Sequence, residues 1–283
     1  MKGFRYLVAG LASLGLIATA GTQASAAGPT HFTINKNEVY AGWSVHPPSG
    51  TTTEAAASWK VPQVQCSAPL GSRAWKQSRA AMWVGIWGQN PASSKSWLAQ
   101  TGTVSQCLNG GVYSYTAFAE MFPQPQKTLS VQVHPGDEIW AGITYRGRVA
   151  AGKDKGKLKF TFNIVDHADY PSGQATADLY TSQNVLVKDA AWQGGAIVEQ
   201  EPNGESGVFA IGGLAKLSTP ASFSSVGVNG YRPYQYSGSA LHRWDMYNTV
   251  YRVHHPPTLG TELLASTGAD TATGFQVTWK NWN

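Results

Sequence analysis

Short runs of aromatic and β-branched residues recur about every 10 residues along this chain, and Gly, Pro, Asn and Ser separate them. No segment beyond the N-terminus keeps an amphipathic helical period over about 12 residues. Many short strands with frequent turns are typical of an antiparallel sandwich or barrel. The 283 residues fit one domain of this kind, because all-β domains often reach that size.

The strands that we expect share this composition and are bounded by turn residues. They cover residues 39–45, 55–61, 81–87, 97–103, 112–122, 128–133, 138–145, 157–166, 175–179, 196–200, 208–217, 221–228, 249–253 and 274–282. The sequence His-Pro-Gly-Asp at 134–137 predicts a turn, and the lysine-rich residues 153–159 predict a solvated hairpin tip.

The first 26 residues have the three parts of a secretory signal peptide. Lys2 and Arg5 form the basic region, residues 7–17 the apolar region, and Ala24-Ser25-Ala26 the cleavage site. The apolar region is shorter than the roughly 20 residues that span a bilayer. We expect a signal peptide at 1–26, a short N-terminal segment at 27–39 and a single domain at 40–283, in a secreted, extracellular protein.

The charge of the chain argues against two classes of partner. Its formal net charge is +5, which becomes +3 once Lys2 and Arg5 leave with the signal peptide. Only 13% of the residues are charged, and outside 153–159 the basic ones are thinly spread. A nucleic-acid binder carries a stronger basic footprint, and the mature chain has no apolar run that could enter a membrane. We expect a monomer without nucleic-acid or membrane partners.

The chain has two cysteines, Cys66 and Cys107. In an oxidising compartment a disulfide is the default state of such a pair. The bridge would close a loop of about 40 residues and stabilise the fold by roughly 4 kcal/mol on the chain-entropy estimate. We predict a Cys66–Cys107 disulfide rather than a catalytic thiol.

Three polar side chains share a strand face with apolar neighbours. The period of two puts Gln100 with Leu98, and Glu120 with Phe118 and Phe122, while Glu199 lies with Ile197. Apolar surroundings disfavour the charged form of a carboxyl group and so raise its pKa, which is the direction that acid–base catalysis requires.

Several short motifs follow one another along the chain. They are Tyr40-Ala41-Gly42, Trp59-Lys60-Val61-Pro62, Trp83-Val84-Gly85-Ile86, Leu98-Ala99-Gln100-Thr101-Gly102, YTAFAEMFP at 115–123, Pro135-Gly136-Asp137, AIVE at 196–199 and FQVTW at 275–279. Their order resembles that of one known family, the eqolisins, which are glutamic peptidases. The resemblance covers most of the chain beyond the signal peptide. It implies a sandwich of two antiparallel sheets, similar to the legume lectins and concanavalin A, in a secreted member of the bacterial type.

The resemblance also implies the site. Gln100 and Glu199 fall on the catalytic positions, with Glu199 as general base and then general acid, and Gln100 orienting the water and donating to the oxyanion. Trp83 and Glu120 fall on positions that line the substrate cleft. Trp87 stands at the adjoining cleft position, where eqolisins usually have Asp. The expected activity is metal-independent cleavage of protein or peptide substrates at acidic pH, with no cofactor.

Other interpretations stay open from the residues alone. Gln100 and Glu199 could be a structural amide and a surface carboxylate, and a lectin-like sandwich could be a non-catalytic glycan or cell-wall binding module. Glu120 and Glu199 could instead be the paired carboxylates of a glycoside hydrolase, which lie about 5 to 10 Å apart. Glu199 beside Gln100, with Glu120 further along the cleft, would count against that enzyme. The histidines, including His254 and His255, lack metal-ligand spacing, so no metal site is expected.

Overall fold

The computed structural model describes the chain in fourteen segments, and all of its regular structure is β-sheet or short 3₁₀ turns. The segments are residues 32–37, 39–48, 50–66, 77–90, 95–108, 113–181, 192–199, 202–203, 210–211, 213–215, 217–236, 238–250, 258–269 and 274–280. Within them the helices are two 3₁₀ turns, η2 (Pro233–Gln235) and η3 (Gly238–Ala240). No helix in these segments has the length and apolar character to span a bilayer. The predicted signal peptide lies outside the described residues.

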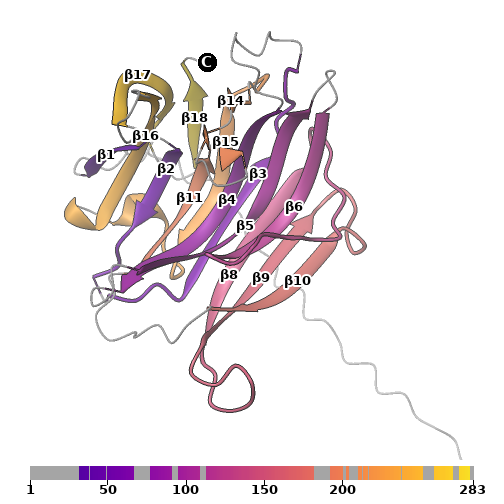
Figure 1. Cartoon of the computed structure of the whole chain (residues 1–283), viewed down its shortest axis with the longest axis vertical. Helices are drawn as coiled ribbons and strands as arrows, with labels where there is room; N and C mark the ends of the chain where they lie inside the picture. Colours follow the sequence, from indigo (N-terminus) through magenta and orange to yellow (C-terminus); the bar gives the residue numbers. More distant parts are fainter. Residues whose placement is uncertain are drawn as a thin grey trace, which may run out of the picture.

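One hydrogen-bonded sheet folds over itself into two layers (Figure 1). The β4 layer contains, in spatial order, β2 (Tyr40–Val45), β11 (Gln193–Glu199), β4 (Gln77–Asn90), β5 (Lys95–Leu108), β6 (Tyr113–Phe122) and β7 (Lys127–Thr128). The β8 layer contains β10 (Gln174–Tyr180), β9 (Leu158–Asp166), β8 (Glu138–Arg148), β3 (Glu54–Lys60), β15 (Ala221–Val228) and β18 (Phe275–Trp279). Strands that share no ladder pack across the gap, among them β3 on β4, β4 on β8 and β5 on β9. The all-β sandwich prediction is confirmed.

Two further strands, β16 (Leu241–Val250) and β17 (Thr258–Thr267), join the layers at one edge. β16 pairs with β2 as far as Trp244 and with β17 from Met246, and its register with β17 is irregular. Such irregularities bend a strand, which lets β16 pass from one layer to the other. The remaining strands are short: β1 (Thr33–Asn37) runs parallel to β16, β14 (Gly213–Leu214) runs parallel to β4, and β12 (Pro202–Asn203) pairs with β13 (Ala210–Ile211).

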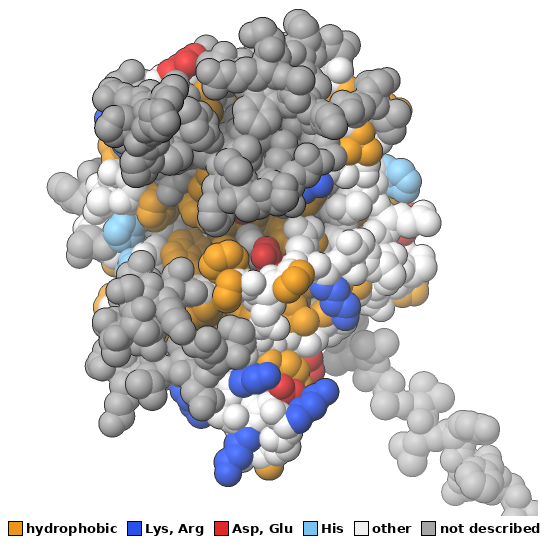
Figure 2. All heavy atoms as spheres, in the orientation of Figure 1, with side chains coloured by type: hydrophobic (Ala, Val, Ile, Leu, Met, Phe, Trp, Pro, Cys, Tyr) orange, Lys and Arg blue, Asp and Glu red, His pale blue; other side chains and the backbone are white. Residues whose placement is uncertain are grey.

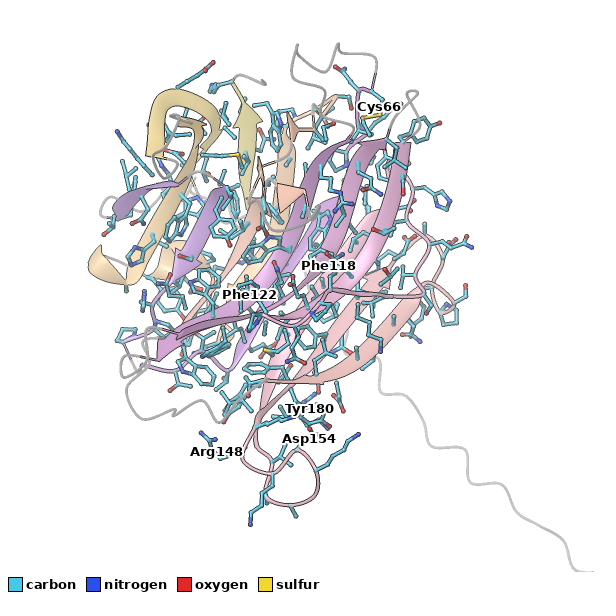
Figure 3. All side chains as sticks on the ribbon, viewed as in Figure 1. Cys66, Phe118, Phe122, Arg148, Asp154 and Tyr180 are labelled. Carbon is cyan, nitrogen blue, oxygen red and sulfur yellow. A yellow bond between two sulfur atoms is a disulfide. The ribbon has the colours of Figure 1, made fainter. Side chains whose placement is uncertain are left out.

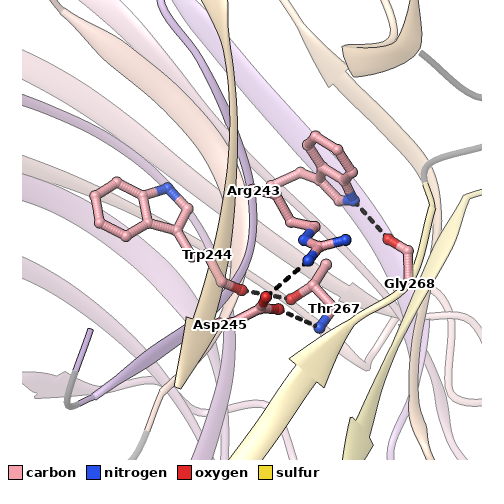
Figure 4. A network of polar contacts seen from close by, with 6 residues as sticks. Arg243, Trp244, Asp245, Thr267 and Gly268 are labelled. Carbon is pink, nitrogen blue, oxygen red and sulfur yellow. Dashed lines mark hydrogen bonds and ion pairs between the residues drawn. The ribbon is translucent and has the colours of Figure 1, made fainter. Parts of the chain in front are cut away.

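Polar contacts hold β16 against β17 where β16 changes partner (Figure 4). The buried Asp245 carboxylate accepts hydrogen bonds from Arg243 Nη2 at 2.9 Å and from the Thr267 backbone N–H at 2.8 Å. Thr267 Oγ1 donates to the Trp244 carbonyl at 2.6 Å. A buried carboxylate is tolerated when it is paired and hydrogen-bonded in this way.

Strand β4 is buried on both faces. Its even-numbered residues point between the layers into the main core, and its odd-numbered residues point to the outer face of the β4 layer. The main-core residues of β4 are Ala80, Met82, Val84 and Ile86. A second hydrophobic cluster on the outer face consists of Ala81, Trp83, Val104, Phe118 and Ile197. The β4 layer therefore carries an apolar surface that the other layer does not cover.

Most predicted strands are present, with three informative differences. Of the expected strand at 128–133, only Thr128 belongs to a strand, as the last residue of β7. Leu129, Val131 and Val133 are buried in alternation, although they belong to no strand. Of the expected strand at 249–253, residues 249 and 250 form the end of β16, which begins at Leu241, and residues 251–253 lie outside the described residues. β17 and β1 were not predicted, because mixed polar and apolar residues mask their alternation.

The predicted Cys66–Cys107 disulfide is present, with the two Cα atoms 5.3 Å apart and 41 positions between the residues. Because the bridge closes a loop of that length, replacing both cysteines with alanine should lower the free energy of unfolding by about 4 kcal/mol. Urea denaturation of the variant and the oxidised wild type measures the difference, with reduced wild type as the control. Equal stability of all three would contradict the prediction.

Candidate active site

The outer face of the β4 layer arranges its side chains in ranks, because the register aligns equivalent positions across neighbouring strands. The glutamine rank contains Gly195, Gly85, Gln100 and Glu120, from β11 to β6. The next rank, the tryptophan rank, contains Ile197, Trp83, Gly102 and Phe118. The third, the glutamate rank, contains Tyr40, Glu199, Ala81, Val104 and Thr116. All three predicted polar residues therefore face the same side of the layer.

Gln100 and Glu120 are cross-strand neighbours joined by a hydrogen bond. Gln100 is 6% exposed and donates from Nε2 to Glu120 Oε2 at 2.6 Å. The buried Gln100 Oε1 has no hydrogen-bond partner within the described part of the chain. An ionised carboxylate can only accept, so it selects the amide orientation in which the nitrogen faces it. The contact thus leaves the Gln100 carbonyl oxygen to accept from another group.

Burial raises the pKa of the Glu120 carboxyl, and the hydrogen bond from Gln100 opposes this rise. Both effects are expected, because desolvation disfavours the carboxylate and a donor to the carboxylate favours it. Glu120 therefore takes up its proton at a higher pH than an exposed glutamate.

Trp83 and Glu199 form the second polar contact of the face. The indole Nε1 of Trp83 donates to Glu199 Oε2 at 2.7 Å. The opposite edge of the ring lies over Gly85, where an added Cβ would meet Trp83 Cζ3 at 2.6 Å. The absence of a side chain at Gly85 thus lets the buried indole extend from the glutamine rank toward Glu199.

Tyr40 adds a phenol to the same site. It is the β2 neighbour of Glu199, and its ring meets Trp83 edge to face with centroids 5.8 Å apart. Burial, then the charge of Glu199 and then that of Glu120, raises the pKa of Tyr40, so the phenol stays protonated. The sequence contained Tyr40 only as part of the Tyr-Ala-Gly motif, without a role in the site.

A profile of the Peptidase A4 family matches residues 38–192, which is more than half of the chain. The chain belongs to this family. It is the eqolisin family that the motifs predicted. The matched region contains Trp83, Trp87, Gln100 and Glu120 and ends before Glu199. No curated protein matches the sequence.

Solved eqolisin structures have a similar fold. Scytalido-glutamic peptidase with a transition state analog inhibitor superposes with a TM-score of 0.56 at 14% identity, covering 86% of this chain and 99% of that one. The same peptidase with a peptide-based transition state analog gives 0.52 at 13% identity, with the same coverage. SCP-B, a member of the eqolisin family, in a complex with the tripeptide Ala-Ile-His, gives 0.49 at 12% identity, again with 86% and 99% coverage. At 14% and 13% identity, the likeness to the two scytalido-glutamic peptidase structures shows the shared fold alone.

In this eqolisin the predicted site residues form pairs that differ from the expected arrangement. Glu120, not Glu199, is the hydrogen-bonded neighbour of Gln100. Gln100 and Glu199 align with Gly85 and Ala81, which are four positions apart on β4 and so about 13 Å apart along the strand at roughly 3.3 Å per residue. The tryptophan rank lies between them. Parity along each strand placed each polar residue with its apolar neighbours, but it could not predict the offset between strands.

A fourth rank beside Gln100 forms an apolar ledge, which consists of Trp87, Leu98 and Phe122. Trp87 and Leu98 are partly buried against the second cluster, and Trp87 meets Trp83 with ring centroids 6.0 Å apart. Phe122 is 46% exposed, and Figure 3 shows it along β6 from Phe118. Trp87 was predicted as a cleft residue, whereas Leu98 and Phe122 were not predicted to line the cleft. Their alternation with Gln100 and Glu120 is the signal that could have identified them.

This face is hollowed in the space-filling view, where an acidic side chain lies among hydrophobic ones (Figure 2). Across the described segments, no three His, Cys, Asp or Glu side chains are grouped so that they could hold a metal ion. His254 and His255 lie outside the described residues. The groups available for chemistry on this face are therefore carboxyl, amide, phenol and indole groups.

The raised pKa of Glu120 predicts a pH-dependent effect of Glu120→Gln on stability. Between the unfolded and folded pKa values the native state binds more protons than the unfolded state, so wild-type stability falls as the pH rises. Glu120→Gln removes this titration. Relative to wild type, the variant should therefore gain stability from about pH 3 to pH 7, a range that starts below the pKa of an unperturbed glutamate.

Urea unfolding at a series of pH values measures the difference. Glu54→Gln is the matched control, because Glu54 is an exposed glutamate of β3. A stability difference between Glu120→Gln and wild type that stays constant with pH would contradict the assignment.

Proposed function

We propose that this chain is a secreted, metal-independent glutamic endopeptidase that hydrolyses peptide bonds of protein or peptide substrates under acidic conditions, with Gln100 and Glu199 as its catalytic residues. The observation that carries the proposal is an oriented buried amide and a tryptophan-bound carboxylate on one hollowed face, in a chain of the Peptidase A4 family. Export follows from the predicted signal peptide and agrees with the disulfide.

Glu199 serves as the general base. It takes a proton from a water molecule, whose oxygen attacks the carbonyl carbon of the peptide bond, and it then returns the proton to the leaving amine nitrogen. The Trp83 indole holds Glu199 Oε2 at 2.7 Å, which fixes the direction of the carboxylate. A hydrogen bond to a charged group contributes about 1.5–3 kcal/mol, enough to hold one rotamer.

Gln100 serves as the polar partner of the reacting carbonyl. One N–H of Nε2 is bound by Glu120, so the second N–H can donate to the oxygen that becomes negatively charged. Gln100 Oε1 accepts from the attacking water. Glu120 is a positioning residue in this scheme, because it acts by fixing the amide of Gln100.

In this scheme the scissile bond lies between Gln100 and Glu199, and the buried indole of Trp83 lies between the strand positions of the two residues. Both side chains would have to extend toward the scissile bond, because they are offset along β4. Gly85 and Gly102 have no side chains on this face because their space is occupied: the Trp83 ring lies over Gly85, and the β4 backbone packs closely against Gly102.

The other two functions have weaker support from this geometry. Glu120 accepts a hydrogen bond from Gln100, and the tryptophan rank separates Glu120 from the glutamate rank, which contains Glu199. This arrangement does not resemble two carboxylates that face each other across a sugar. A glycan-binding module has no need for an amide oriented by a carboxylate. Neither alternative has the support of a family match.

Glu199→Gln and Gln100→Ala should each reduce cleavage of a denatured protein substrate by at least about a hundredfold, because they remove the base and the oxyanion donor. Cleavage is measured from about pH 2 to pH 7, with an inhibitor of aspartic peptidases and with EDTA. We expect activity that resists both inhibitors. Folded Glu54→Gln protein serves as the matched control. Full activity of either site variant, or no cleavage by folded wild type at any pH, would refute the proposal.

The ledge of Trp87, Leu98 and Phe122 should select a bulky apolar side chain at a position next to the scissile bond. Trp87→Ala should lower kcat/KM for a peptide with Phe or Leu there by about 10- to 100-fold, since one apolar contact of this size contributes about 1–3 kcal/mol. The same variant should leave kcat/KM for a peptide with Ala there within about threefold. Tyr231→Ala, which truncates an exposed aromatic of the other layer, is the control. Equal losses for both peptides would show that Trp87 is structural.

A further inference from the structure

The positive charge of the chain is concentrated in one short segment. Residues 146–159 contain six of the 21 basic residues and one of the 16 acidic residues. The rest of the sequence has 15 basic and 15 acidic residues, so its formal charge is zero. The whole formal net charge of +5 therefore belongs to these fourteen positions.

This segment is the hairpin that joins β8 to β9, and it extends beyond the two layers at the bottom of Figure 1. Backbone hydrogen bonds order its tip: Val149 N–H donates to the Lys157 carbonyl at 2.9 Å, and Gly156 N–H donates to the Val149 carbonyl at 2.8 Å. Gly152 and Gly156 have φ values of 82° and 85°, which glycine adopts without a steric penalty. The basic groups are thus displayed on an ordered tip.

The basic side chains of the hairpin divide into two kinds. Lys157 pairs with Asp154 at 2.8 Å, and Lys159 pairs with Asp178 at 2.6 Å. Lys153 and Lys155 are exposed and form no ion pair with any residue that the structure describes. The acidic groups near the hairpin therefore compensate part of its charge, and the tip remains strongly positive.

The tip also has a concave surface. A hollow of about 390 Å³ is lined by charged side chains from both strands and the tip, together with one tyrosine. These residues are Arg146, Arg148, Lys153, Asp154, Lys159 and Tyr180. Figure 3 shows Arg148, Asp154 and Tyr180 gathered at this end of the molecule, and Figure 2 shows basic side chains clustered there. Arginine and lysine around a hollow can contact an anionic group from several sides.

We propose that the β8–β9 hairpin is a docking surface for a linear, phosphate-bearing polymer, which holds the protein at a polyanionic surface. An exposed tip of net positive charge, on a protein whose other residues carry no net positive charge, attracts a polyanion by releasing its counterions. The inference is independent of the proposed peptidase activity. It assigns a partner to a segment that the sequence indicated only as a solvated tip.

The chemistry of the tip favours such a polymer over a membrane or a nucleic acid. Residues 146–159 contain no exposed large apolar side chain, since Leu158 is fully buried, so nothing is available to insert among lipids. They contain no aromatic residue, and Tyr180 is the one aromatic residue that lines the hollow, whereas single-stranded nucleic acids stack successive bases on several aromatic side chains. The lysines act as point charges that match repeated phosphates without reading their sequence.

The test measures binding of inorganic polyphosphate to the purified full chain at several salt concentrations. Lys153→Gln with Lys155→Gln should weaken binding at low salt at least tenfold, and it should reduce the slope of log affinity against log salt by about 1.4, since each lysine releases about 0.7 counterions from a single-stranded polyanion. Lys60→Gln with Lys280→Gln makes the same change in net charge at exposed positions elsewhere, and it should weaken binding by less than threefold.

Three results would overturn the proposal. They are no binding of polyphosphate by folded wild type at low salt, equal losses in the two double variants, and tighter binding to anionic lipid vesicles than to polyphosphate. Cleavage of a small uncharged peptide is measured in parallel. It should be the same in wild type and in both double variants, so failure of the docking surface can be distinguished from failure of the catalytic assignment.

Discussion

Burial of β4 on both faces is the constraint on which the rest of this structure depends. Met82 and Val84 belong to the core between the layers, and Trp83 between them belongs to the outer cluster. A sheet face exposed to water normally carries polar residues, and this one has a large indole with Phe118 and Ile197 around it. The polar side chains of the site on that face therefore lie on an apolar surface.

That apolar surface determines the electrostatics of the site. Burial raises the pKa of Glu120 and keeps the Tyr40 phenol protonated, while each carboxylate has a specific donor, Gln100 for Glu120 and Trp83 for Glu199. Desolvation strengthens such hydrogen bonds and makes unpaired polar groups costly. The buried, unpartnered Oε1 of Gln100 is therefore the polar atom of this face that a substrate or water has most reason to satisfy.

Alternation along the strands predicted the fold class, and it placed Gln100, Glu120 and Glu199 each beside apolar neighbours of its own strand, because both depend on the period of two. The motifs predicted the family. The pairing between strands could not be predicted from the sequence. Nothing near Gln100 in the chain indicates that Gly85 lies opposite it, or that Trp83 separates it from Glu199. β16 was only partly predicted, because Arg243 and Asp245 break its alternation, and their burial is possible only once they pair with each other and with Thr267.

The strand order also has a kinetic consequence. Tyr40 near one end of the chain lies opposite Glu199, and β2 also pairs with β16 more than two thirds of the way along the sequence. Contacts between such distant segments form late in folding, because closing the long stretch of chain between them costs entropy before the contacts can stabilise the fold. During synthesis, β4, β5 and β6 can pair before Glu199 has been added to the chain. The outer face is therefore completed only near the end of folding, and the order of the strands delays its function until the chain has been made.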